Sequence, residues 1–138
     1  MKKVVNLSIF DYAGAGSRYS SAVNRVGKYS STSIKIYPHT YGYTSDITMY
    51  GDKPSVTYVN KFSYEASLNR NNIIKLIDEA DIIHLVGADS VEHWNNIKVW
   101  LSAYNRNRYP YPEISVPISK PIIITAVGSF FRRHLGPL

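Results

Sequence analysis

The sequence predicts an α/β fold in which helices cover both faces of an open, mostly parallel β-sheet. Three observations support this prediction. Short apolar runs bounded by turn residues alternate along the chain with segments of helical periodicity. Glycines follow several of these runs, and 138 residues is a typical length for a single domain. We therefore expect one domain over residues 1–138, built from strand–helix–strand units with right-handed crossovers.

The first such unit is predicted at the N-terminal end of the chain. Residues 3–10, KVVNLSIF, form an apolar run typical of a buried parallel strand. A helix is expected over residues 17–29, and then a strand over residues 31–39 in which isoleucines alternate with Lys35. The helix residues predicted to share an apolar face are Tyr19, Ala22, Val23 and Val26.

Residues 38–66 are the least regular part of the sequence. Tyr, Gly, Asp, Pro and Asn are interspersed there, and residues 55–60, SVTYVN, are the one short strand candidate. Loops of this length in a domain are usually functional or carry small elements of their own.

The second half of the chain returns to the alternating pattern. A helix is predicted over residues 68–80, with Asn69 or Asn71 as its N-cap. Residues 81–87, DIIHLVG, are a β-branched run that ends in glycine, which is typical of a central strand.

The next helix has the strongest N-terminal signal in the sequence. It is predicted over residues 90–106, with Ser90 as N-cap and Trp94 on its apolar face. A connector rich in Tyr-Pro pairs then leads to a last strand over residues 121–128. The following residues, SFFRRHL, favour another helix.

Composition narrows the possible chemistry. Cysteine is absent, so disulfides, zinc–thiolate clusters and a cysteine nucleophile are excluded, and an intracellular, cytoplasmic location is expected. No apolar run approaches the roughly 20 residues that span a bilayer. The formal net charge of +6 favours anionic partners such as nucleotides, nucleic acid or an acidic surface. Because the basic residues are scattered, an ordinary solvated surface is the alternative explanation.

The candidate site is the edge of the sheet where the parallel strands end. Glycines at positions 14 and 16, 87 and 128 fall at such ends, and ligands of open α/β sheets bind along that edge. Glycines before a helix allow close approach of a ligand to backbone N–H groups, which attract anions. A tight turn without a ligand is the alternative. The ligand-binding residues that we predict are Gly14, Gly16, Ser17, Arg18, Gly128, Ser129 and Arg132.

Other site types have little support in the sequence. The dinucleotide fingerprint would need a third glycine at Tyr19, and no Walker lysine follows. The four histidines lack metal-ligand spacing, so neither a metal nor a cofactor is expected. His84 is interpreted as a core or strand-end histidine, Asp81 as a cap or helix terminator, and Asp89 as the more site-like carboxylate.

Three segments match the pattern of a known family. They are FDYAGAGSRYSSAVN with its glycine loop, ADIIHLVGADSVEHW with the strand DIIHL, and KPIIITAVGSFFRR with Gly-Ser followed by arginines. Through them the chain resembles the N-terminal, acceptor-side Rossmann-like domain of GT-B glycosyltransferases. The resemblance implies that Gly14, Gly16, Ser17, Gly128, Ser129 and Arg132 line a cleft, with Asp11 and Arg18 beside it.

The resemblance also sets an expectation for function. In the family, a second domain binds a nucleotide sugar, so a missing C-terminal domain and sugar transfer to a phosphorylated acceptor are implied. Val127 stands where many members have a histidine near the reacting centre, which implies that this chain alone is inactive. The alternative is a stand-alone binding module for a nucleotide, a sugar phosphate or nucleic acid. A structural protein that assembles through tyrosines or an edge strand is a third possibility.

Overall fold

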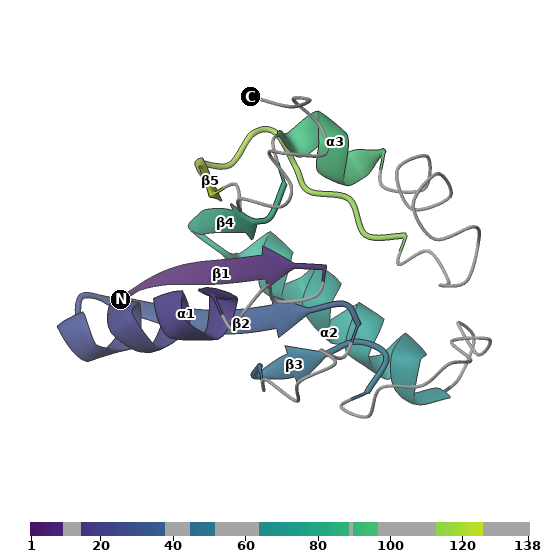
Figure 1. Ribbon diagram of the computed structural model, residues 1–138, viewed down its shortest axis with the longest axis horizontal. Coiled ribbons are helices and arrows are strands. Elements are labelled where there is room, and N and C mark those ends of the chain that lie inside the picture. The colour runs from purple at the N-terminus through teal and green to yellow at the C-terminus, as the bar shows by residue number, and fades with distance from the viewer. Residues whose placement is uncertain (10–14, 38–44, 52–63, 89, 97–112, 126–138) are drawn as a thin grey trace, which may run out of the picture.

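The protein, described here by a computed structural model, is built around one all-parallel β-sheet (Figure 1). The described residues form five strands in the order β3-β2-β1-β4-β5, which confirms the predicted α/β, Rossmann-like fold. The structure describes residues 1–9, 15–37, 45–51, 64–88, 90–96 and 113–125. In chain order the elements are β1 (Lys2–Ser8), α1 (Ala15–Val26), β2 (Tyr29–Lys35), β3 (Ile47–Thr48), α2 (Tyr64–Glu79), β4 (Ile82–Val86), α3 (Val91–Asn95) and β5 (Ile122–Thr125).

Within the described residues the predicted elements agree with the structure in type and order, with three differences. Helix α3 ends at Asn95, with Asn96 as its C-cap, rather than continuing to residue 106, and the helix expected after residue 128 lies outside the described residues. The short strand β3 lies within the segment expected to be irregular, whereas the strand candidate at residues 55–60 lies outside the described residues. Helix α2 begins at Tyr64 rather than at Leu68, so Asn69 lies inside the helix and does not cap it. Its amide instead donates to the carbonyl oxygens of Thr48 and Met49, at 3.3 and 3.1 Å, and thereby ties α2 to the β3 region.

The central strands have one apolar and one polar face, and both are buried. Val5 and Leu7 of β1 alternate with Asn6 and Ser8, and all four side chains are less than 3% exposed. Parallel strands buried on both faces are usually apolar throughout. The polar residues at alternate positions therefore define a distinct layer on one side of this sheet.

The apolar face packs against α2 and α3. Ile73 and Ile77 of α2 and Trp94 of α3 are buried against it, and the Trp94 indole Nε1 donates to the carbonyl oxygen of Ile114 at 3.1 Å. The buried residues of this core are Val5, Leu7, Ile9, Ile34, Ile36, Tyr37, Met49, Ile73, Ile77, Ala80, Ile83, Leu85, Ala88, Trp94, Ile114 and Val116.

Helix α1 packs against the polar face through small residues. Its buried positions are Gly16 and Ser20, whereas Tyr19 is 41% and Val26 is 67% exposed. Of the residues predicted to share an apolar face, Tyr19 and Val23 line a cavity beside the sheet, whereas Val26 is largely exposed. The sheet surface beneath α1 carries serine and asparagine, so the helix presents hydrogen-bonding and small residues to it.

The outer edge of β2 is covered by side chains rather than by a full-length neighbouring strand. Strand β3 pairs with the end of β2 only. Before that point, the Asn24 amide bonds to both the N–H and the carbonyl oxygen of Ser31, at 2.8 and 2.9 Å. Asp46 Oδ2 accepts from the Ser33 N–H at 2.9 Å. These side chains occupy backbone groups that an exposed edge would offer to another chain.

Turn and cap residues set the ends of several elements. Ser90 caps α3 as predicted, with its Oγ accepting from the N–H of His93 at 2.9 Å. Gly27 after α1 and Gly87 after β4 have φ values of +79° and +86°, which favour glycine. None of the helices in the described segments is long and apolar enough to cross a membrane.

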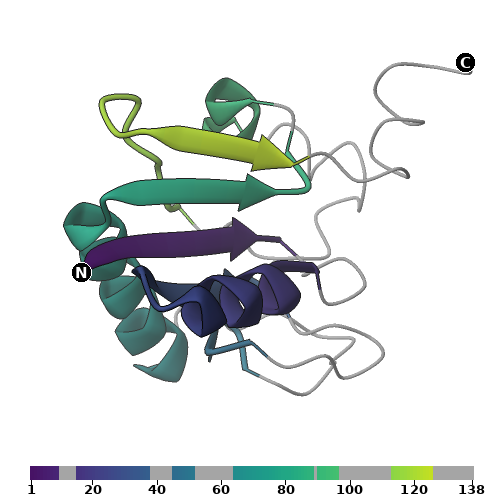
Figure 2. The ribbon, with the colours of Figure 1, turned by 90° about the vertical axis from the view of Figure 1, so that its left-hand side faces the viewer.

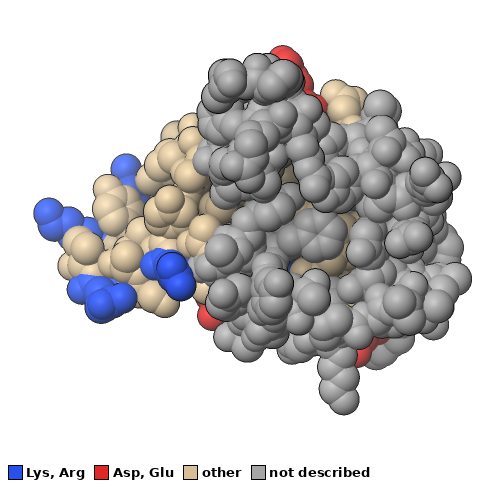
Figure 3. Space-filling model, viewed as in Figure 1, with Lys and Arg blue, Asp and Glu red and all other residues tan. Residues whose placement is uncertain are grey.

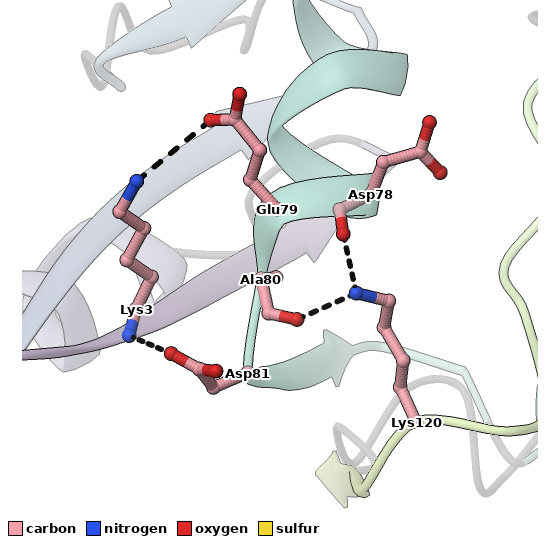
Figure 4. A network of polar contacts seen from close by, with 6 residues as sticks. All are labelled: Lys3, Asp78, Glu79, Ala80, Asp81 and Lys120. Atoms are coloured by element: carbon pink, nitrogen blue, oxygen red, sulfur yellow. Dashed lines mark hydrogen bonds and ion pairs between the residues drawn. The ribbon is translucent and has the colours of Figure 1, made fainter.

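A polar network joins the elements at the amino edge of the sheet (Figure 4). The Lys120 ammonium donates to the carbonyl oxygens of Asp78 and Ala80 at the end of α2, at 2.6 and 2.7 Å. Asp81 Oδ2 accepts from the Lys3 N–H at 2.8 Å, and the Lys3 ammonium lies 3.8 Å from Glu79. A cation at this position complements the negative end of the helix dipole.

Candidate functional site

The carboxyl ends of the strands form the edge at which a ligand was predicted. Figure 2 shows β1, β4 and β5 side by side with their arrowheads at the same edge. From β1 the chain continues through α1 to β2 on one side, and from β4 it continues through α3 to β5 on the other. Connections that diverge in this way leave a switch point between β1 and β4, where open α/β sheets bind ligands.

The first turn of α1 brings three predicted residues to this edge. Gly16 is buried against the sheet, Ser17 is half-buried, and Arg18 is exposed. The Oγ atoms of Ser17 and Ser45 are 3.4 Å apart. The first turn of α1 contains no acidic side chain, so no carboxylate of that turn neutralises the positive end of the helix dipole.

The remaining predicted site residues lie outside the described residues. Their positions therefore stay predictions. The predicted site residues outside the described segments are Gly14, Gly128, Ser129 and Arg132, and Asp11, Asp89 and Val127 lie outside them as well.

Ser17 lines a polar pocket of about 230 Å³ beside α1. The pocket lies between this helix and the β2–β3 side of the sheet, and hydroxyl, amide and carboxylate groups line it. Asp46 provides the carboxylate, whose Oδ2 is 3.3 Å from the Ser33 Oγ, while the Asp46 N–H donates to that same Oγ at 3.0 Å. The lining residues are Ser17, Ser20, Ser21, Asn24, Ser33, Ser45 and Asp46.

Membership of Ser45 and Asp46 in this pocket could not be predicted from the sequence. They lie within the irregular segment at residues 38–66, and no sequence motif connects that segment to the glycine loop. Tertiary packing of β3 beside β2 brings them to α1. The only sequence feature that pointed to a functional role for this segment was its unusual length.

A second cavity lies on the other flank of α1, and it contains His84. The imidazole is buried, with Nδ1 2.7 Å from Asn6 Oδ1 and Nε2 2.7 Å from Thr125 Oγ1. Burial lowers the pKa of His84 from its ordinary value, because a charged imidazole would lose its hydration. The expected core or strand-end histidine is thus buried on the polar face of β4, within a chain of side-chain hydrogen bonds.

Positive charge in the described residues is concentrated away from the carboxyl edge. Figure 3 shows Lys and Arg side chains at the end of the molecule near the N-terminus. Lys2 pairs in register with Tyr29, which places it beside Lys28, and Arg25 is in the last turn of α1. These three residues and Lys3 are exposed, and we call them the amino-edge basic patch. At the opposite edge, Lys35 ends β2 and is only 1% exposed.

Neither a metal site among the described residues nor a related protein identifies the ligand of this edge. In the described part of the chain, no group of three His, Asp or Glu side chains is arranged to hold a metal ion. Comparison of the sequence with protein-family profiles and curated proteins, and of the fold with solved structures, finds no significant match.

Proposed function

We propose that the protein binds a phosphorylated, hydroxyl-rich ligand, such as a nucleotide or a sugar phosphate, at the carboxyl edge beside α1. The observation that carries this proposal is the position of Ser17. It belongs to the first turn of α1 and also lines the polar pocket. One ligand would therefore contact both the positive end of a helix and a wall of hydroxyl groups.

The two parts of the site suit different parts of such a ligand. N–H groups at a helix start favour a phosphate, and Arg18 on the same turn is exposed and available to pair with it. The pocket groups suit sugar hydroxyls, since Asp46 accepts and the serines both donate and accept hydrogen bonds. A pocket of about 230 Å³ is smaller than the roughly 300–1,000 Å³ of most ligand sites, so it would hold one ring.

Sugar transfer is the more specific form of this proposal. If a second domain that binds a nucleotide sugar accompanies this chain, the pocket beside α1 would hold the acceptor. The resemblance to the GT-B acceptor domain and the hydroxyl-lined pocket support it. On its own, the chain would act as a binding module.

A thermal-shift panel of nucleotides, nucleotide sugars, sugar phosphates and unphosphorylated sugars tests the proposal. A ligand that binds only the folded protein stabilises it by about 2.7 kcal/mol at 100 times its Kd. We expect a phosphorylated member to raise the melting temperature. Arg18→Gln should weaken its binding about tenfold or more, because a charge-assisted hydrogen bond is lost.

Arg25→Gln is the matched control. It removes the same charge from an exposed position of the same helix, but at the opposite end, so ligand affinity should stay at the wild-type value. Equal effects of the two substitutions would contradict a site at the start of α1.

Nucleic-acid binding is the second candidate, because the amino-edge basic patch gathers four exposed cations. It predicts oligonucleotide affinity that falls steeply with salt. That affinity should decrease in Lys2→Gln and Lys28→Gln and stay unchanged in Arg18→Gln. If the variants behave in this way and no small ligand raises the melting temperature, nucleic-acid binding would be favoured over a phosphorylated ligand at the carboxyl edge.

A further inference from the structure

The cavity that contains His84 is an apolar groove of about 460 Å³, within the usual range for sites that bind small molecules. It lies on the polar-face side of the sheet, where α1 leaves β4 and β5 uncovered by described residues. At its rim Tyr19 is 41% and Ile123 is 53% exposed, so the groove opens to solvent. Its apolar walls are Val4, Tyr19, Val23, Tyr29, Ile82 and Ile123.

The polar groups that line this groove are consecutive members of one hydrogen-bonded chain. They are Asn6 on β1, His84 on β4 and Thr125 on β5. The Asn6 amide Nδ2 donates to Ser31 Oγ at 2.6 Å and to Ser20 Oγ at 3.2 Å, which directs its Oδ1 toward His84. Because Oδ1 only accepts, His84 carries its proton on Nδ1.

This tautomer determines the role of the other ring nitrogen. Nε2 has a free electron pair in the neutral imidazole, so at 2.7 Å it accepts the hydroxyl proton of Thr125. Burial lowers the pKa of His84, which keeps the ring neutral at pH 7. Tyr19 packs edge-on against the imidazole, with ring centroids 4.9 Å apart. The hydroxyl, imidazole and amide are thus held in the order of a nucleophile, its base and the group that orients the base.

We propose that Thr125 is an acyl-accepting nucleophile activated by His84, and that the groove binds the apolar acyl group of an ester. Thr125 Oγ1 attacks the ester carbonyl carbon while its proton passes to His84 Nε2. The bond to the alcohol breaks, and the alcohol leaves with that proton. Water, deprotonated by His84, then attacks the acyl-threonine and releases the acid, which restores the Thr125 hydroxyl.

The roles of the three residues follow from their contacts. Thr125 and His84 are the catalytic residues, and Asn6 is a positioning residue that acts through the tautomer of His84. General-base assistance of this kind contributes about 10²–10⁴-fold to a rate. This site lies on the opposite flank of α1 from the polar pocket, so the inference does not depend on the ligand proposed there.

The full chain incubated with the p-nitrophenyl esters of acetic and octanoic acid provides the test. Release of p-nitrophenolate gives the rate, intact mass gives the acyl adduct, and peptide mapping gives its position. We expect an adduct on Thr125, formed faster from the octanoyl than from the acetyl ester because the groove is apolar. Thr125→Val should lower the acylation rate about 100-fold or more, and so should His84→Gln.

Two further variants separate chemistry from folding. Thr125→Ser keeps a hydroxyl and should retain acylation, whereas Thr32→Val removes a hydroxyl from the opposite face of β2 and should behave as wild type. If Thr125→Val does not fold, the position of the acyl adduct in the wild type and in Thr125→Ser tests the inference instead. Adducts only on lysine or tyrosine, or a wild-type rate in Thr125→Val, would overturn the inference. Acylation of Thr125 without any response to the ligand panel would overturn only the proposed function.

Discussion

Buried in the middle of β4, the imidazole of His84 has exchanged its hydration for two side-chain hydrogen bonds of 2.7 Å each. Both bonds are satisfied in the neutral form. Protonation on Nε2 would replace an accepted hydrogen bond from Thr125 with a donated one and would place a charge on a largely buried ring. The same environment that orients the ring therefore makes its charged form unfavourable.

This environment predicts how the free energy of unfolding depends on pH. The pKa of His84 is lowered in the folded protein and returns to about 6.5 on unfolding. Below about pH 6.5 the unfolded chain binds a proton that the folded protein does not, so stability falls as the pH decreases toward the lowered pKa. Above about pH 6.5 the contribution of His84 is complete. Among the residues that the structure describes, the other titratable side chains that line the groove are Tyr19 and Tyr29.

Urea unfolding of the wild type and of His84→Gln between about pH 5 and pH 8 checks this prediction. The wild type should lose up to about 1.4 kcal/mol per pH unit more than the variant in the acidic part of this range. Parallel curves for the two proteins would show that His84 is not the responsible group. Observation of the imidazole resonances by NMR gives its pKa directly.

At the scale of single elements, the C-terminal end of α2 depends on a residue distant in sequence. Lys120, which precedes β5, donates to the last carbonyl groups of the helix. Lys120→Met keeps the length of the side chain but removes the ammonium, and should lower the free energy of unfolding by about 1 kcal/mol. Lys75→Met removes an exposed charge from the middle of the same helix and should change it much less. Equal losses in a denaturant titration would exclude a capping role.

Elements differed in how well the sequence predicted them. The apolar runs at β1, β4 and β5 have few alternatives to a strand, and Ser90 is a strong cap signal, so these predictions were confirmed. The two-residue strand β3 is too short to produce a periodic pattern. The apolar face expected on α1 did not show which side of the helix packs on the sheet, because the sheet beneath α1 is lined by serine and asparagine and the buried helix residues are Gly16 and Ser20.

Across the whole molecule, the sites depend on side chains that meet only through the sheet topology. The carboxyl edge and the place of Ser17 could be predicted from strand ends and glycines. The Asn6–His84–Thr125 chain could not, because its hydrogen bonds join residues 78 and 41 positions apart. Asn6 and Thr125 resemble ordinary strand residues until β1, β4 and β5 become neighbours.

The polar layer beneath α1 also has a consequence for motion. Hydrogen bonds contribute only about 0.5–1.5 kcal/mol each, and α1 buries just Gly16 and Ser20, so little apolar area resists its detachment from the sheet. Native-state amide hydrogen exchange should therefore show α1 amides opening at a lower free energy than those of β1 and β4, without global unfolding. Protection of α1 equal to that of β1 would contradict this expectation. Since α1 separates the two cavities, each such opening would briefly join them into one solvent-filled space.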